Sequence, residues 1–212
     1  MVLLNAIYFK ADWQEPFFED YTKEMPFYLA DGTQKQHPIM FQLSGNLYYE
    51  NEDFQAVNLP YKKGRVSMFI FLPREKVGLE GFYQVLNQKN WENWMEQFFL
   101  ERINLGLPKF KTEYKVTLND VLKSLGMEIA FNYSADFSKM LRSSSGLYID
   151  EVKHKTFIEV NEQGTEAAAV TSVTGVRSLP PEMFVNRPFF FAIRDNESGT
   201  ILFMGEILNP KN

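Results

Sequence analysis

The sequence predicts an α+β fold that combines antiparallel sheets with a few helices. Its 212 residues are 45% hydrophobic and 16% aromatic, which is enough apolar material for a substantial core. Short strand-like runs alternate irregularly with helical stretches and are joined by many tight turns, an order typical of this class. No repeat or linker divides the chain, and we therefore expect a single domain over residues 1–212.

The first part of the chain carries strand signals. Residues 2–9 form a nearly continuous apolar run, which is typical of a central strand covered on both faces. Because this run opens the chain with no leader or cap, we expect Met1 to be an internal residue of a longer protein. Two hairpins come next, each built around a glycine-containing turn. Their strands are residues 25–29 with 35–40, and 56–59 with 66–72.

Helical spacing is found in two places. The first helix extends from about Leu79 to Phe98, where Trp91 and Trp94 are interpreted as packing residues without a further function. The second repeats leucine and valine at i, i+3, i+4 and i+7 and ends before Gly126, a favoured residue after a helix C-terminus. Further strands are predicted from alternating or apolar runs. They contain Ile103 to Leu107, residues 155–160, and a last hairpin of 189–193 with 201–205.

Composition excludes several functional classes. The net charge of −5 and pI near 5.2 argue against a nucleic-acid partner. No apolar run approaches the ~20 residues that span a bilayer, so we expect no membrane partner. Without cysteine there is no thiolate zinc site, and the two histidines lack spaced carboxylates, so we expect neither metal nor cofactor. An enzyme is not expected either, because there is no G-x-S-x-G elbow and Ser143 to Gly146 lacks a nearby histidine.

The most informative segment begins at Glu162 and reads E-Q-G-T-E-A-A-A-V-T. By composition it is a flexible surface loop of small residues. Its residues nevertheless alternate like those of a strand, with Thr165, Ala167 and Ala169 on one face. Gly164 can accommodate a backbone rotation at the start of such a strand. A long connection without structure of its own is uncommon within a domain and is usually functional.

This segment resembles the hinge of the serpin family, the serine protease inhibitors. The sequence that follows the family's reactive bond is matched here by S-L-P-P-E and N-R-P-F-F-F. Other family blocks are matched in the same order by L-N-A-I-Y-F-K with Trp13, by L-P-K-F-K and by L-G-M. The resemblance implies a serpin-like fold of antiparallel and mixed sheets with an exposed reactive-centre loop over about 162–185. It identifies the chain as the C-terminal portion, which starts at the third strand of the main sheet and lacks the N-terminal helices and first main-sheet strands.

The resemblance also implies a mechanism and a partner. A serine protease would cleave the loop and form an acyl-enzyme, and the freed loop would insert between residues 2–12 and roughly 150–161. It further implies a monomer at full length and favours a secreted or extracellular protein. The hinge residues implied by the match are Glu162, Gly164, Thr165, Glu166, Ala167, Ala168 and Ala169.

The reactive bond has two possible positions. Counting back from S-L-P-P-E gives Arg177-Ser178, which suits a trypsin-like protease and is favoured, although an isolated arginine is usually only a solvated surface residue. Counting forward from the hinge gives Ser178-Leu179, which suits an elastase-like enzyme. A non-inhibitory serpin that acts as a carrier or chaperone, or an inactive fragment, remains the alternative function.

Three residues outside the loop match family positions that control opening of the main sheet. Asn5 and His154 match the shutter pair, and Trp13 matches the breach, where the loop first enters the sheet. Ordinary explanations exist for two of them as well. His154 is also explained as a buried, hydrogen-bonded imidazole, and Trp13 as a partly buried core aromatic.

Overall fold

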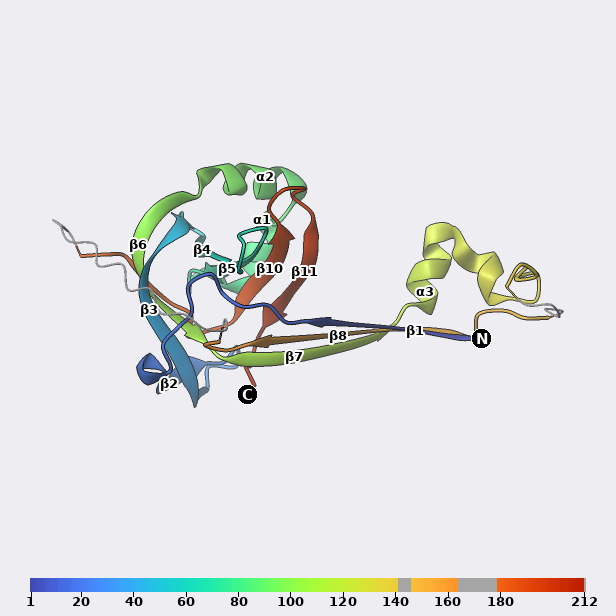
Figure 1. Cartoon of the computed structure of the whole chain (residues 1–212), viewed down its shortest axis with the longest axis horizontal. Helices are drawn as coiled ribbons and strands as arrows, with labels where there is room; N and C mark the ends of the chain where they lie inside the picture. Colours follow the sequence, from blue (N-terminus) through green and yellow to red (C-terminus); the bar gives the residue numbers. More distant parts are fainter. Residues whose placement is uncertain (141–145, 164–178, 212) are drawn as a thin grey trace. The chain divides into compact units, whose positions relative to one another are not determined.

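The computed structural model describes residues 1–140, 146–163 and 179–211, and the chain divides into two compact units. The smaller unit comprises Met1–Lys10 and Lys111–Glu159, and the larger comprises Ala11–Phe110 and Val160–Asn212. Each unit contains its own sheet, whose strands except β9 are labelled in Figure 1. The combination of sheets with a few helices confirms the predicted α+β class.

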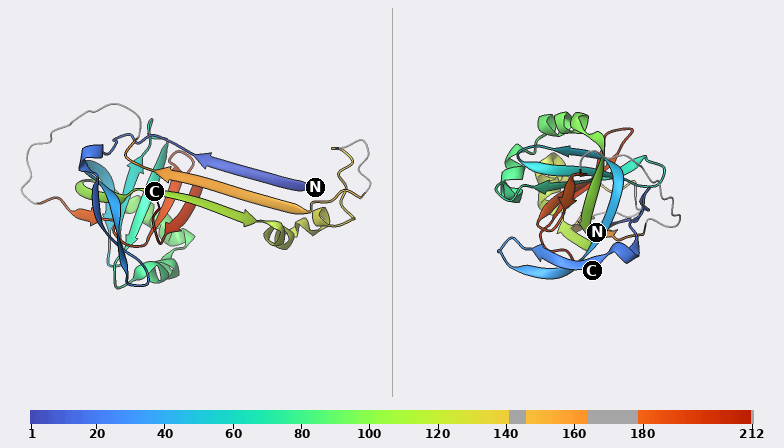
Figure 2. Two further views of the ribbon diagram at one scale, coloured as in Figure 1. Left: turned by 90° about the horizontal axis from the view of Figure 1, so that it is seen from below. Right: turned by 90° about the vertical axis from the view of Figure 1, so that its left-hand side faces the viewer.

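The smaller unit is built on a three-stranded sheet in the order β1-β8-β7. Its strands are β1 (Val2–Phe9), β7 (Phe110–Thr117) and β8 (Glu151–Val160), and they lie side by side in Figure 2. β1 and β8 are parallel and adjacent, with Asn5 opposite His154. A short α3 (Asn119–Leu122), a π-helical turn (Lys123–Met127) and a 3-10 turn (Glu128–Phe131) come after β7.

Two expectations for this unit need correction. β1 is a strand as predicted, but it lies at the edge of its sheet and its apolar side chains are exposed, with Leu4 at 75%. It has one neighbouring strand, β8, so it is not the covered central strand that its composition suggested. The helix before Gly126 exists, but only its first turn is α-helical. Gly126 has a φ of +97°, the left-handed conformation that favours glycine, and Leu125 on the predicted packing face is 74% exposed.

The larger unit contains an eight-stranded sheet with the path β11-β10-β5-β4-β3-β6-β9, and β2 pairs with β3 beside that path. All three predicted hairpins are confirmed as antiparallel pairs, namely β2 with β3, β4 with β5, and β10 with β11. A 3-10 turn, Glu19–Tyr21, precedes them. The strands are β2 (Lys23–Tyr28), β3 (Gln34–Glu50), β4 (Phe54–Pro60), β5 (Val66–Pro73), β6 (Phe99–Pro108), β9 (Glu182–Phe184), β10 (Phe189–Asp195) and β11 (Ile201–Ile207).

Two helices, α1 (Gly78–Val85) and α2 (Gln88–Gln97), replace the single helix predicted from Leu79 to Phe98. The chain becomes extended at Leu86, and the Asn87 side chain accepts a hydrogen bond from Asn90 N at 3.0 Å, which caps α2. No helix among the described residues is long and apolar enough to cross a membrane.

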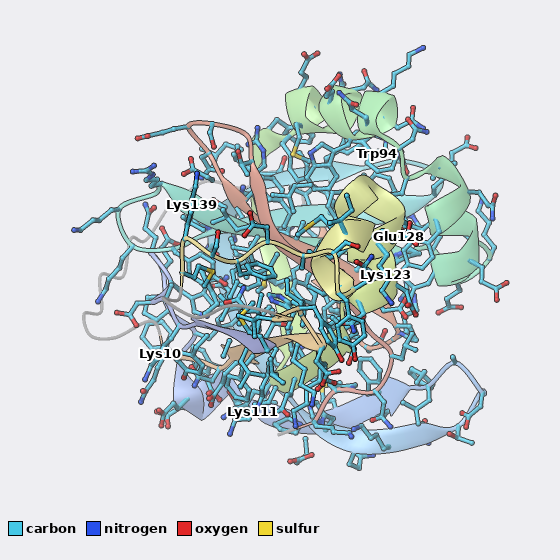
Figure 3. All side chains as sticks on the ribbon, turned by 90° about the vertical axis from the view of Figure 1, so that its right-hand side faces the viewer. Lys10, Trp94, Lys111, Lys123, Glu128 and Lys139 are labelled. Carbon is cyan, nitrogen blue, oxygen red and sulfur yellow. The ribbon has the colours of Figure 1, made fainter. Side chains whose placement is uncertain are left out.

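An aromatic core lies between these helices and the sheet. Phe71 of β5 is fully buried and contacts aromatic rings from both helices and from β4 and β10. Trp94, which is labelled in Figure 3, is 5% exposed and lies 4.8 Å from the ring of Phe54. Trp91 packs on the rings of Phe69 and Phe71, so the packing role predicted for both tryptophans is confirmed.

Candidate functional site: the two ends of segment 164–178

The predicted hinge from Gly164 to Ala169 and the predicted bond Arg177-Ser178 lie outside the described residues. The structure does describe both ends of this segment, and both belong to the larger unit. We call residues 161–163 and their contacts the N-terminal anchor, and residues 181–187 and their contacts the C-terminal anchor. Leu179, the first residue described after the segment, is 94% exposed.

The N-terminal anchor is centred on Glu162, whose side chain is almost completely buried. Thr22 Oγ1 donates a hydrogen bond to Glu162 Oε1 at 2.7 Å, and Lys109 Nζ forms an ion pair with Oε2 at 2.8 Å. Both carboxylate oxygens therefore have a partner, as a buried charge requires. The predicted hinge thus begins at a residue fixed by two other segments of the larger unit.

Opposing effects determine the ionisation of Glu162. Burial favours the protonated acid, but the hydrogen bonds from Lys109 and Thr22 together stabilise the carboxylate more strongly. The pKa of Glu162 is therefore below the ordinary value for a glutamate. This anchor holds a carboxylate at neutral pH.

Trp13 lies beside the same anchor. Its indole Nε1 donates to Asn161 O at 3.0 Å, and its ring is 4% exposed and stacks on Tyr61 with 4.5 Å between centroids. Trp13 therefore contacts the residue directly before Glu162. The structure thus brings together two residues that were singled out from the sequence. Burial raises the pKa of the Tyr61 phenol far above its ordinary range, so Tyr61 remains neutral.

Sequence reasoning missed three residues of this anchor. Lys109 lies in the L-P-K-F-K block, but its partner could not be inferred because Glu162 is 53 residues further along the chain. Thr22 has no local signal at all. His37 is 3% exposed, and its Nε2 lies 2.6 Å from the backbone oxygen of Lys109, which fixes the backbone of the residue that forms the ion pair.

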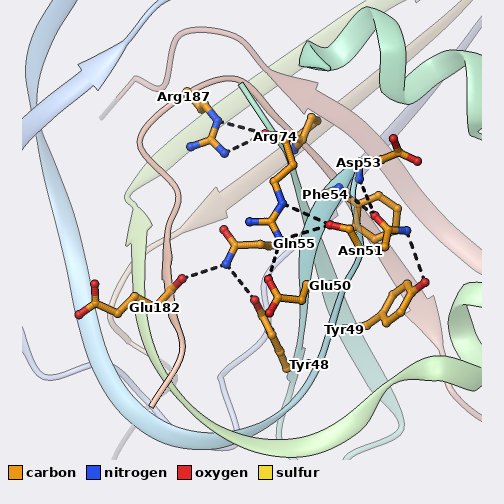
Figure 4. Close-up of polar contacts among 11 residues, drawn as sticks. Tyr48, Tyr49, Glu50, Asn51, Asp53, Phe54, Gln55, Arg74, Glu182 and Arg187 are labelled. Carbon is orange, nitrogen blue, oxygen red and sulfur yellow. Dashed lines mark hydrogen bonds and ion pairs between the residues drawn. The ribbon is translucent and has the colours of Figure 1, made fainter. Parts of the chain in front are cut away.

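The C-terminal anchor is formed by main-chain contacts. Asn104 N donates to Pro181 O at 2.9 Å, and β9 then continues as a parallel partner of β6. Gln55 Nε2 donates to Glu182 O at 2.9 Å and to Tyr48 Oη at 2.8 Å (Figure 4). Burial raises the pKa of Tyr48 to about 12, so this phenol stays neutral as a hydrogen-bonding group.

Arg187 fixes the end of this anchor. Its Nε and Nη2 atoms donate to Pro73 O at 3.0 and 2.8 Å (Figure 4). A carbonyl that receives two bonds from one guanidinium has a defined orientation. The residues on both sides of segment 164–178 are thus fixed within the larger unit.

In the smaller unit, Asn5 and His154 are in contact. Asn5 Nδ2 lies 3.3 Å from His154 Nδ1, and the two residues are direct partners in the parallel β1–β8 register. Tyr8 stacks on Phe157 further along the same pair of strands, with 5.3 Å between centroids. The two strands predicted to flank an inserted loop are therefore adjacent in this structure.

The described residues offer no centre for metal chemistry. Within residues 1–140, 146–163 and 179–211, no three His, Asp or Glu side chains are grouped so that they could hold a metal ion. What the arrangement provides is two fixed positions, Glu162 and Pro181, on either side of segment 164–178. Such a geometry can present a peptide to another protein.

Comparisons with known proteins agree on one family. The sequence model described as Serpin (serine protease inhibitor) matches residues 1–210. Neuroserpin of Gallus gallus is 35% identical over 223 residues, which cover 100% of this chain and 54% of neuroserpin. Native protease nexin-1 with heparin superposes with a TM-score of 0.83 at 34% identity and covers 99% of this chain and 56% of that one.

A second solved structure is similar to the same extent. The thermophilic serpin tengpin in its native state gives a TM-score of 0.79 at 36% identity, over 98% of this chain and 55% of tengpin. The chain therefore spans about half the length of the relatives it matches.

Proposed function

Because this chain belongs to the serpin family, we propose that the protein inhibits a trypsin-like serine protease by offering Arg177-Ser178 as bait and trapping the acyl-enzyme. Proteins of this family are protease inhibitors in general and mostly not enzymes, and some of them do not inhibit. The trapping mechanism, the protease class and the scissile bond are the parts proposed for this protein.

One observation carries the proposal. The chain on either side of segment 164–178 is fixed within the larger unit, at Glu162 by buried side-chain contacts and at Pro181 by a main-chain hydrogen bond. β1 and β8, between which the loop would insert, are direct neighbours. This adjacency supports the proposal, because loop insertion requires a sheet that has not yet received the additional strand.

The covalent step would use the chemistry of serine proteases. The protease serine Oγ attacks the carbonyl carbon of Arg177, and its proton passes through the protease histidine to the nitrogen of Ser178 as the peptide bond breaks. The products are an ester between the protease and Arg177, and a new amine at Ser178. Water would normally hydrolyse that ester, and we propose that loop insertion prevents it.

Insertion requires β1 and β8 to separate, which would break the contact between Asn5 and His154. Each inserted residue would gain main-chain hydrogen bonds worth roughly 0.5–1.5 kcal/mol each. The hinge sequence suits this step because its inward residues, Thr165, Ala167 and Ala169, are small and uncharged. The variant Thr165→Arg would have to bury a charge, so we expect it to be cleaved without trapping the protease.

The test is to mix the full-length protein with trypsin at equal concentrations and to analyse the products by denaturing electrophoresis and mass spectrometry. We expect an adduct that survives denaturation and is joined through Arg177, with a released peptide that begins at Ser178. A released peptide that begins at Leu179 would move the bond to Ser178-Leu179 and favour an elastase-like partner. Clean cleavage without an adduct would overturn inhibition and support a non-inhibitory serpin.

A further inference from the structure

The middle of β3 has an inverted pattern of burial. Gln42 and Asn46 point to the buried face, where they are 9% and 6% exposed, whereas Leu43 and Leu47 point to the open face and are 50% and 42% exposed. A strand with one solvent-facing side normally places its apolar residues inward. This strand therefore presents leucines on the side where charged residues are usual.

The neighbouring strands add apolar residues to this face, which also carries Arg102, Asn104 and Glu182. Leu100 of β6 is opposite Leu47 and is 74% exposed. At the other end, Phe184 of β9 is 38% exposed and lies edge-to-face on Phe41, 5.8 Å between centroids. Directly paired residues share a face of the sheet, so these side chains lie on one surface. We call this set the outer apolar stripe, and it consists of Phe41, Leu43, Leu47, Leu100 and Phe184.

The stripe lies where the outer pairing of both strands is partial. β3 pairs with β6 over Ile39–Tyr48 but with β4 only over Leu47–Glu50, and β6 pairs with β9 only over Asn104–Gly106. The feature that distinguishes this region for a partner is its exposed apolar side chains. Apolar side chains grouped on an open surface are typical of protein–protein contacts.

The stripe is continuous with the C-terminal anchor. β9 contributes Phe184 to the stripe and begins three residues after Leu179, which is 94% exposed. Asn104 N holds Pro181 O, and β9 is parallel to β6, so the chain approaches β9 from the side of β6 that carries Leu100. A protease bound where the chain emerges at Leu179 would face this part of the sheet.

We infer that the outer apolar stripe is a second contact surface for the trypsin-like protease, which would meet it with an apolar surface beside its active-site cleft. This inference rests on the proposed function, because the protease is the occupant to which it commits. The surface would raise the rate of encounter and the lifetime of the first complex, before any bond is cleaved. The trapping step would not depend on it.

The test replaces Leu47 and Leu100 with serine in the full-length protein. The matched control is Met204→Ser, because Met204 is 67% exposed on β11 at the other end of the same sheet. Two quantities are compared with those of the wild-type protein. They are the dissociation constant for trypsin whose nucleophilic serine is replaced by alanine, and the second-order rate constant of adduct formation with active trypsin.

We expect the double variant to bind inactive trypsin roughly tenfold more weakly and to form adduct roughly tenfold more slowly, with no change for Met204→Ser. If adduct never forms but the affinity still falls, docking stands and the proposed trapping fails. If adduct forms and both quantities match the wild-type values, docking is wrong. Lower thermal stability with unchanged affinity would also overturn it, because the stripe would then be covered by another part of the protein.

Discussion

Two strands of similar composition have opposite environments in this chain. β5, V-S-M-F-I-F-L-P, lies between β4 and β10 and is buried along almost its whole length. β1, V-L-L-N-A-I-Y-F, lies at the edge of the three-stranded sheet and is exposed from Val2 to Tyr8. An apolar run therefore predicts a strand and a tendency to be buried. It does not predict which other element will bury it.

The comparison extends to the stability of the two units. Complete burial of a large apolar side chain contributes about 1.5–3 kcal/mol, and the larger unit gains this for a whole cluster of aromatic residues. In the smaller unit, Leu4, Tyr8 and Leu125 remain more than half exposed. We therefore expect side chains of the same type to differ strongly in their contribution to stability, according to the unit to which they belong.

The largest expected effect is that of Phe71→Ala. Phe71 is fully buried among aromatic rings, and its truncation should lower the free energy of unfolding of the larger unit by about 3–5 kcal/mol. Urea denaturation followed by tryptophan fluorescence measures this unit selectively, because all three tryptophans lie within Ala11–Phe110. The matched variant is Tyr8→Ala in β1, where the ring is 57% exposed. The sequence of the smaller unit contains no tryptophan, so the loss for this variant is measured by hydrogen exchange of the β8 amides. Equal losses for the two variants would contradict the contrast between β5 and β1.

The second effect concerns the N-terminal anchor. Glu162→Gln removes the negative charge beside Lys109, and we expect a loss of about 1–3 kcal/mol at pH 7, since a hydrogen bond to a charged group is worth about that much. The pKa of Glu162 is lowered in the folded protein, so its carboxylate stabilises the fold above the unfolded pKa. That contribution is lost as the pH falls through the folded pKa.

The measurement is urea denaturation of both proteins from pH 7 to pH 3. The difference between wild type and Glu162→Gln should be constant near neutral pH and should shrink in the acidic range. A difference that does not change with pH would mean that the charge of Glu162 has no part in the anchor. Thr22→Val, which removes only the neutral donor, is the matched control.

The extent to which the sequence predicted these features can be judged from particular residues. The serpin-like α+β fold, the hairpins and the contact between Asn5 and His154 were predicted from local patterns and from the family resemblance. The break at Leu86 and the edge position of β1 were not predicted. The first depends on two extended residues, Leu86 and Asn87, between two helical stretches, and the second depends on which strands are present to pair.

The contacts of the anchor were missed for a different reason. Thr22 and Glu162 are separated by 140 residues, and although the family resemblance singled out Glu162, nothing in the sequence indicates that Thr22 is its partner. Long-range side-chain pairs of this kind depend on the complete fold, and a single sequence contains no signal for them. The roles assigned to the hinge and the reactive bond stay predictions, because they fall outside the described residues.

A smaller effect is expected at His37. Burial lowers the pKa of this imidazole, and Lys35 acts in the same direction, while the bond to Lys109 O and the charge of Glu24 oppose them. The folded state therefore favours neutral His37. Its stabilising contribution is complete above the unfolded pKa of about 6.5 and is lost as the pH falls from there towards the folded pKa.

The variant His37→Gln separates this titration from the hydrogen bond, because the glutamine amide can also donate to Lys109 O. We expect the stability of the variant to vary less than that of the wild type between pH 7 and pH 5, when both are measured by urea denaturation with tryptophan fluorescence. Parallel pH profiles for the two proteins would exclude His37 as the group responsible.

The smallest effect is expected in the smaller unit, at Lys155→Met. Lys155 Nζ lies 3.0 Å from Glu113 on the adjacent part of the sheet, but both side chains are more than 40% exposed, and Glu113 also pairs with Lys115 at 2.7 Å. Water and Lys115 replace most of the interaction that Glu113 loses with Lys155. The rate of hydrogen exchange of the β8 amides should therefore not change measurably. Faster exchange that 1 M salt abolishes would instead mean that charge pairs hold this sheet together, and that its stability depends on surface electrostatics where the larger unit depends on its core.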